Sequence, residues 1–191
     1  MKTLICSILI AASTNLFAQQ SDSPRNYLFD IELSVIHPIL GGFGGTVGIE
    51  KNHLGFGVMG FGTKLNEMVK HYLMENVEGL AVYNWGVELY SDYYIKQNHR
   101  RLFLGAVVSL NGYRFTDIPA PQTIHVLYAA PRIGYRLNLP KKLSAFYVQP
   151  ALTFQIKIWD NVDKFLYQEI DMNSTFLLSQ LTIGMKIKSL V

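Results

Sequence analysis

The stretch Ser144–Ile158, SAFYVQPALTFQIKI, alternates between two kinds of residue. One set is apolar: Phe146, Val148, Pro150, Leu152, Phe154, Ile156 and Ile158. The other set is smaller or more polar: Ala145, Tyr147, Gln149, Ala151, Thr153, Gln155 and Lys157. Successive side chains of a β-strand point to opposite faces. A period of two therefore predicts a strand with two different faces.

The same period recurs along the chain and predicts an all-β fold. We expect eight strands, at 28–37, 43–50, 54–64, 80–95, 101–115, 124–138, 143–158 and 174–188. The facing of the third and fifth strands is undetermined, because glycine or apolar residues occupy both faces. Short connections at 51–53, 96–100 and 139–142 contrast with long ones at 65–79, 116–123 and 159–173. The longest apolar run, Leu102–Leu110, is too short for a membrane-spanning helix, which needs about 20 residues.

An export signal precedes the strands. Lys2 supplies a positive charge, Leu4–Ala12 a short apolar run, and Ala18 a small residue at the cleavage point. We expect residues 1–18 to be removed and residues 19–191 to form one β-barrel domain outside the cytoplasm. The only cysteine, Cys6, lies within this signal. The exported domain is therefore expected to lack disulfides and thiolate ligands.

Alternating strands fit two opposite kinds of barrel. A soluble lipocalin-like carrier has its apolar face inside, and a membrane barrel has it outside. Only 16% of the residues are charged, against about 25% in a typical soluble domain. The less apolar faces carry small or uncharged residues such as Gln149, Thr153 and Gly184, which suit a narrow lumen. We therefore expect a closed antiparallel up-and-down transmembrane β-barrel, with a soluble periplasmic ligand carrier as an alternative.

This pattern, with the glycine-rich first hairpin Pro38–Glu50, resembles the small eight-stranded outer-membrane β-barrels of Gram-negative bacteria, the OmpA/OmpX barrel-domain type. The resemblance extends over nearly all of residues 19–191. It implies an integral protein of the cell outer membrane, in contact with outer-membrane lipid. We expect a monomer with a structural or surface-interaction role and no cofactor.

If the polar faces point into the barrel, charges of opposite sign meet there. Closing the barrel places the first strand beside the last, which brings Asp30 and Glu32 near Lys186 and Lys188. Buried charges are destabilising unless they are paired. We therefore expect ion pairs that plug the lumen, formed by Asp30, Glu32, Glu50, Glu88, Asp92, Arg132, Arg136, Lys157 and Lys186.

Two further features concern the outside of the barrel. Aromatic residues on or near strand ends are expected to mark the membrane interfaces: Tyr83, Trp85, Tyr93, Tyr135 and Trp159. The segment 65–79 is unusually apolar for an external loop. It is expected to form a short amphipathic helix on the barrel rim, or to bind a surface partner.

Catalysis, metal binding and nucleic-acid binding find little support. Asp30 and Glu32 lie about 7 Å apart along a strand, but salt bridging explains such a pair better than glycoside hydrolysis does. Lipid A deacylases carry His and Ser two residues apart on one strand face, and neither His37 nor His125 has such a serine. We expect no catalytic residue, with a lipid A deacylase-like enzyme acting on outer-membrane lipid as the alternative. The 5 histidines show no metal-ligand spacing, and the net charge of +3 is scattered.

Overall fold

The computed structural model describes residues 27–95, 100–162 and 170–188. The predicted export signal, residues 1–18, lies outside these ranges and stays a prediction.

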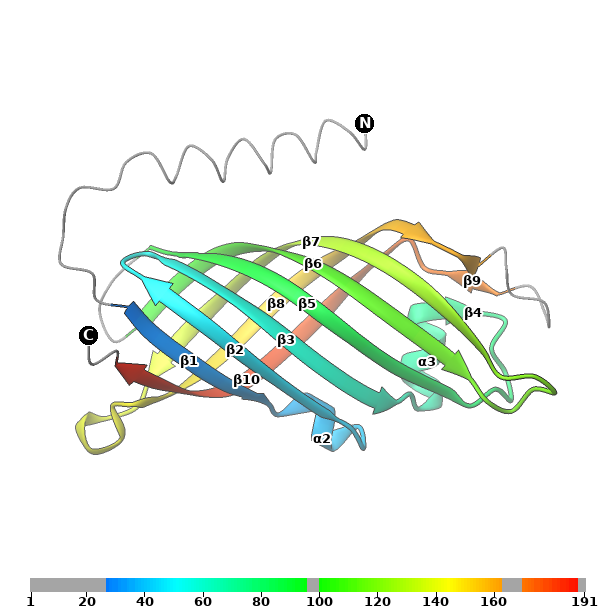
Figure 1. The fold of residues 1–191 in the computed structure, drawn as a ribbon, viewed down its shortest axis with the longest axis horizontal. Helices are drawn as coiled ribbons and strands as arrows, with labels where there is room; N and C mark the ends of the chain where they lie inside the picture. The colour runs from blue at the N-terminus through cyan, green and yellow to red at the C-terminus, as the bar shows by residue number, and fades with distance from the viewer. Residues whose placement is uncertain (1–26, 96–99, 163–169, 189–191) are drawn as a thin grey trace.

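Eight long strands close into one antiparallel barrel (Figure 1). Around the ring their order is β1, β10, β8, β7, β6, β5, β3 and β2, so each strand pairs with its neighbours in the chain and the first pairs with the last. The strands span β1 (Tyr27–Ser34), β2 (Phe43–Lys51), β3 (Leu54–Lys64), β5 (Val82–Tyr94), β6 (Arg100–Phe115), β7 (Gln122–Asn138), β8 (Phe146–Asp160) and β10 (Thr175–Lys188). The predicted fold class is confirmed.

The apolar face of the strands points outward. In β8, Phe146, Leu152 and Phe154 are 38%, 46% and 45% exposed, whereas Tyr147 and Thr153 between them are fully buried. A soluble carrier would need the opposite facing. The structure also shows how β3 and β6 face, which the sequence left undetermined. Met59, Phe61, Phe103 and Val107 are buried, so both strands also turn large apolar side chains inward.

Inward aromatic rings lie over glycines of the neighbouring strand. Phe103 pairs with Gly134 across β6 and β7, and Tyr147 pairs with Gly184 across β8 and β10. A Cβ added at either glycine would lie 2.2 Å from the facing ring. A small barrel has room only for packed side chains. The missing Cβ therefore makes the space that each ring fills.

The two ends of the barrel differ. The start of β1, the β2–β3 turn and the end of β10 lie together, since Tyr27 pairs with Lys51 and Leu28 with Lys188. The opposite end carries the short helix α2 (Ile36–Ile39), the helix α3 (Glu67–Leu73) and the paired segments β4 (Met74–Glu75) and β9 (Asp171–Met172). A short 3-10 helix, η1 (Lys141–Leu143), lies between β7 and β8. No helix of the described residues has the length and apolar character needed to cross a membrane.

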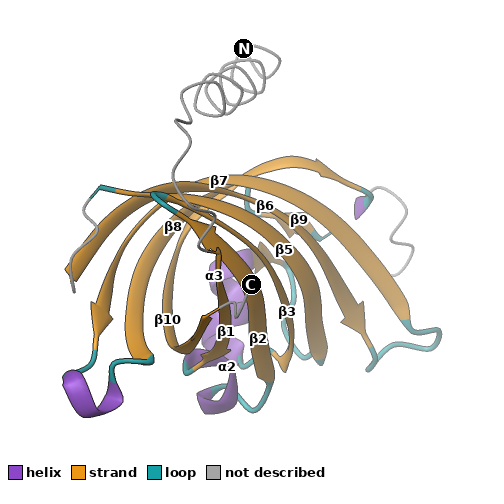
Figure 2. Cartoon of the chain, turned by 60° about the vertical axis from the view of Figure 1, so that its left-hand side comes forward, coloured by secondary structure: helices purple, strands orange, loops and turns teal. Residues whose placement is uncertain are grey.

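The segment after β3 covers this second mouth of the barrel (Figure 2). Asn66 begins α3 by accepting a hydrogen bond from the Val69 amide, at 2.9 Å. Leu73, Met74 and Val77 are buried in a cluster with side chains of β5, β6, β7 and β10. Met68 and Tyr72 stay exposed on the outer side. We call residues 65–80 the lid.

Gly184 and Gly60 provide a matched test of the inward packing. Gly184→Ala should lower the free energy of unfolding by about 1–3 kcal/mol, because the Tyr147 ring must move. Gly60→Ala should change it by less than about 0.5 kcal/mol, because a Cβ there meets nothing within 4 Å. Urea unfolding of the purified protein in detergent measures both. Equal midpoints for the two variants would contradict this account of the lumen.

Candidate functional site

Arg136 lies at the centre of the charged lumen. It comes from β7, is 1% exposed, and faces three carboxylates from the first two strands. Its guanidinium nitrogens lie 3.3 Å from Asp30, 3.4 Å from Glu32 and 2.9 Å from Glu50. The strand alternation places Asp30 and Glu32 on the same inner face, so one guanidinium can reach both.

Neutral groups hold the same guanidinium in place. The Arg136 Nε donates a hydrogen bond of 2.6 Å to the side-chain oxygen of Gln149. The rings of Tyr147 and Tyr94 lie 4.1 and 4.8 Å from the guanidinium carbon. Tyr147 in turn donates a hydrogen bond of 2.7 Å to Glu32. Ion pairs and stacked rings together fix the side chain across the lumen.

The charges in this layer balance. Arg101 forms an ion pair with Glu50 and is buried. Lys186 is the strand partner of Asp30, and its ammonium lies 5.6 Å from the Tyr147 ring centre. Three carboxylates therefore face Arg101, Arg136 and Lys186. Arg101 was not predicted from the sequence, because β6 is apolar on both faces and its facing could not be assigned. We call this group the Arg136 cluster.

A second charged layer lies nearer the lid. Arg132 of β7 lies 3.7 Å from Asp92 of β5, with its guanidinium over the rings of Tyr90 and Phe103, at 4.7 and 5.1 Å. Glu88, on the same inner face of β5 and closer to the lid, accepts a hydrogen bond of 3.2 Å from Gln180.

Lys157, which the sequence placed in the lumenal network, lies in neither of these layers. Its ammonium lies 2.9 Å from Asp160 and 4.0 Å from Asp171, close to the lid, and donates a hydrogen bond to the Met172 carbonyl. The reason is its place along the strand. Lys157 lies opposite Tyr128 near the lid end of β8, whereas Gln149 of the same strand reaches Arg136.

The five aromatic residues predicted at the interfaces point away from the lumen. Tyr83, Trp85, Tyr93 and Trp159 are exposed, and Tyr135 is half-buried. Tyr83, Trp85 and Trp159 lie toward the lid end, whereas Tyr93 and Tyr135 lie toward the end with short turns.

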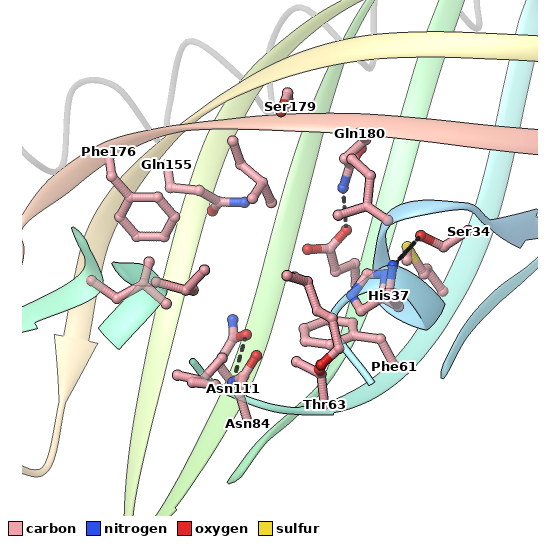
Figure 3. Close-up of a pocket in the computed structure, with 18 of the residues that line it drawn as sticks. Ser34, His37, Phe61, Thr63, Asn84, Asn111, Gln155, Phe176, Ser179 and Gln180 are labelled. Carbon is pink, nitrogen blue, oxygen red and sulfur yellow. Dashed lines mark hydrogen bonds between the residues drawn. The ribbon is translucent and has the colours of Figure 1, made fainter. Parts of the chain in front are cut away.

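A cavity of about 100 Å³ lies under the lid (Figure 3). Its apolar side includes Phe61, Leu73 and Phe176, and its polar side includes Glu88 and Gln155. His37 and Ser34 line it at the α2 end. The cavity therefore offers both apolar walls and polar groups, whereas the Arg136 cluster deeper in the barrel is filled by side chains.

His37 and Ser34 form a contact that no sequence motif indicated. The Nδ1 of His37 lies 2.7 Å from the Ser34 hydroxyl, and the ring packs against Phe61 at 5.1 Å. Burial lowers the pKa of His37 below its ordinary value of 6.5. The two residues are three apart around a tight turn, whereas the deacylase pattern has a spacing of two on a strand.

This pair does not by itself make a catalytic triad. A nucleophilic serine needs a base that is oriented by a third group. Among residues 27–95, 100–162 and 170–188, no carboxylate forms an ion pair with His37 within 4.0 Å. Nor do the side chains of those ranges contain a group of three or more His, Cys, Asp or Glu that could hold a metal ion.

A closed eight-stranded barrel with an apolar outer face and a filled, charged lumen is the architecture of the small outer-membrane β-barrels. Neisserial surface protein A is similar, with a TM-score of 0.53 and 14% identity over 89% of this chain and 100% of that one. The N-terminal β-barrel domain of Pseudomonas aeruginosa OprF has a TM-score of 0.52 and 10% identity, covering 85% and 98%. A major outer membrane protein of Thermus thermophilus has a TM-score of 0.50 and 12% identity, covering 86% and 100%. No family model and no curated protein matches the sequence.

Removing the central guanidinium should be strongly destabilising. Arg136→Met leaves three buried carboxylates without their shared partner, so we expect a loss of about 3–5 kcal/mol in the free energy of unfolding. Arg114→Met, on the exposed side of β6, should stay within about 0.5 kcal/mol. Urea unfolding in detergent gives both values. If Arg136→Met had the same urea unfolding midpoint as the wild type, the cluster would contribute nothing to the stability of the barrel.

The His37 pKa gives a pH dependence of defined sign. The unfolded histidine titrates near 6.5 and the folded one lower, so the folded state holds fewer protons between the two values. Neutral His37 makes its full contribution to the free energy of unfolding above about pH 6.5, and this contribution is lost as the pH falls through the pKa of the folded state. The unfolding midpoint should therefore fall more on acidification in wild type than in His37→Gln. An imidazole that titrates at or above 6.5 by NMR would contradict this.

Proposed function

We propose that this chain is an integral outer-membrane β-barrel with a structural or surface-interaction role, plugged by ion pairs and not catalytic. The observation that carries the proposal is the Arg136 cluster, in which one guanidinium joins three carboxylates across the lumen. The interior of such a barrel stabilises its fold. The surfaces left for interaction with other molecules are the lipid-facing wall and the loops.

Insertion into the outer membrane is supported by the outward apolar side chains and by the predicted export signal. Leu33, Phe154 and Leu177 come from strands that adjoin in the ring, and their side chains are 66%, 45% and 51% exposed. Hydrocarbon tolerates such side chains, whereas water does not favour a continuous apolar band.

The surface role is assigned to the lid. Met68 is 80% exposed, although it belongs to a helix whose other side packs into the barrel mouth. Tyr72 is exposed beside it. The β4–β9 pairing and the hydrogen bond of 2.9 Å from the Asn173 amide to the Leu73 carbonyl hold this helix in one position. A surface partner would therefore meet a rigid apolar patch.

A second candidate function is an enzyme that acts on outer-membrane lipid, which the Ser34–His37 contact favours. Lipid A mass spectra from cells with the wild-type chain, with Ser34→Ala and without the chain separate the two functions. The non-catalytic role predicts identical spectra. Loss of an acyl chain that requires Ser34 would establish the enzyme instead.

The plugged lumen should carry no ion current. Purified full chain in planar lipid bilayers is expected to give no conductance steps, because the Arg136 and Tyr147 side chains cross the lumen. The double variant Arg136→Ala/Tyr147→Ala should leak, whereas the surface double variant Arg114→Ala/Tyr83→Ala should not. Steady conductance of the wild-type chain would rule out the plug.

A further inference from the structure

The barrel wall has an open seam on the lid half of β10. On one side, β10 pairs with β8 along its length, from Thr175 opposite Ile156 to Met185 opposite Phe146. On the other side, its pairing with β1 begins only at Thr182, opposite Ser34. The chain turns away into α2 after that point, and the Val35 amide donates one more hydrogen bond, of 2.8 Å, to the Leu181 carbonyl. Among the described residues, 175–180 of β10 thus have a strand on one side only.

The hydroxyl of Tyr72 shows what this edge binds. It donates a hydrogen bond of 2.7 Å to the Leu177 carbonyl and accepts one of 3.0 Å from the Leu177 amide. Backbone groups of alternate residues point to the same side of a strand. The amide and carbonyl of Ser179 therefore face the seam between Leu177 and Leu181. Within the part of the chain that the structure describes, no group hydrogen-bonds this amide or carbonyl across the seam.

The open edge lies at the level of the apolar outer band. Ser179 is the partner of Leu152, and it stands between Leu177 and Ile183 on the outer face of β10. All three of these apolar side chains are about half exposed. In hydrocarbon there is no water to satisfy a free amide or carbonyl, and open sheet edges are avoided there. This position therefore favours a partner that is dissolved in the membrane.

The seam leads into the cavity under the lid. Leu178, Ser179 and Gln180 of β10 and Ile36 and His37 of α2 line that cavity. In Figure 3 the Gln180 and His37 side chains lie on the cavity side, whereas the Ser179 side chain projects to the outer side of β10, so that Ser179 contributes its backbone. Gln155 lines it from β8, and its side chain is 2% exposed. The oxygen of this amide has no hydrogen-bond partner among the described residues. Two separate features, a free strand edge and a buried free acceptor, thus face one space.

The size of the cavity limits what can enter. An apolar cavity of about 150 Å³ admits a molecule of the size of benzene. About 100 Å³ therefore admits only a short segment of a longer molecule, whose remainder stays outside. The apolar walls suit a hydrocarbon segment, and the Ser179 edge suits a hydroxyl, as Tyr72 demonstrates at Leu177.

We propose that the seam between β10 and α2 binds an acyl chain that carries a hydroxyl group, with the chain inserted into the cavity and the hydroxyl on the Ser179 backbone. The acyl chain belongs to a lipid of the surrounding membrane. The proposal rests on the membrane insertion proposed above, and it adds a lipid-binding activity to a barrel otherwise described as structural.

The test is photo-crosslinking of the full chain in phosphatidylcholine vesicles. The probe is a medium-chain fatty acid with a hydroxyl near its carboxyl end and a diazirine at its methyl end. We expect saturable labelling of the cavity residues Phe61, Leu73 or Phe176, found by peptide mass spectrometry. The same fatty acid without the hydroxyl should bind about tenfold more weakly, as expected for the loss of one buried hydrogen bond.

Three variants of β10 sharpen the test. Ser179→Pro removes the free amide, and proline is tolerated where the amide of a strand faces away from its partner. It should weaken labelling about tenfold, whereas the matched Ser179→Ala, which keeps the amide, should not. Leu178→Trp fills the cavity and should abolish labelling. The heat-modifiable mobility of each variant on gels verifies its fold.

Several results would overturn the proposal. Labelling confined to outward residues such as Leu152, with no change in Ser179→Pro or Leu178→Trp, would show that the barrel is inserted but binds no chain at the seam. Equal labelling by the two fatty acids would show that the hydroxyl does not bind the Ser179 backbone, and would contradict the proposed specificity for a hydroxylated acyl chain. Cross-links joining two copies through β10 would show that a second chain occupies the edge. No labelling of Leu152 or of the cavity would instead refute membrane insertion itself.

Discussion

The Arg136 guanidinium holds together strands that are far apart in the sequence. Asp30 and Glu32 belong to the first strand, Glu50 to the second, and Arg136 to the sixth of the barrel. Each carboxylate would be strongly destabilising if it were buried without a cation. The cluster therefore forms only when the barrel is closed, and it favours the one register in which all three carboxylates meet the same side chain. This constraint also requires the apolar faces to point outward.

The rest of the interior is arranged around this cluster. The rings of Tyr94, Tyr147 and Phe103 fill the space between the charges, and glycines on adjoining strands make room for them. Toward the lid the charges give way to the apolar cluster of Leu73, Met74 and their neighbours. The lumen thus changes from charged and filled to apolar with a small cavity, and the cavity lies where the wall pairing of β10 is incomplete.

The strand pattern could be predicted because period-two alternation survives in nearly every strand. The same alternation placed the three carboxylates, Arg136 and Lys186 of the Arg136 cluster on inner faces, but it could not show that Lys157 lies apart from them. Lys157 lies near the lid end of β8, beside Asp160 and Asp171, and alternation alone does not show which inner residues of different strands lie at the same level. Arg101 was missed because β6 is apolar on both faces. The Ser34–His37 contact and the open edge of β10 arise from where β1 ends, which depends on tertiary packing rather than on local sequence.

Tryptophan fluorescence in brominated lipid tests the central claim, that the charges face the lumen while the apolar residues face lipid. The chain would carry Phe154→Trp as its only tryptophan, with Trp85 and Trp159 replaced by Phe. Phe154 is 45% exposed on the outer face, and its neighbour Thr153 is fully buried. We predict strong quenching when the vesicles contain brominated phosphatidylcholine. Unquenched emission from a folded protein that stays in solution without detergent would contradict the account.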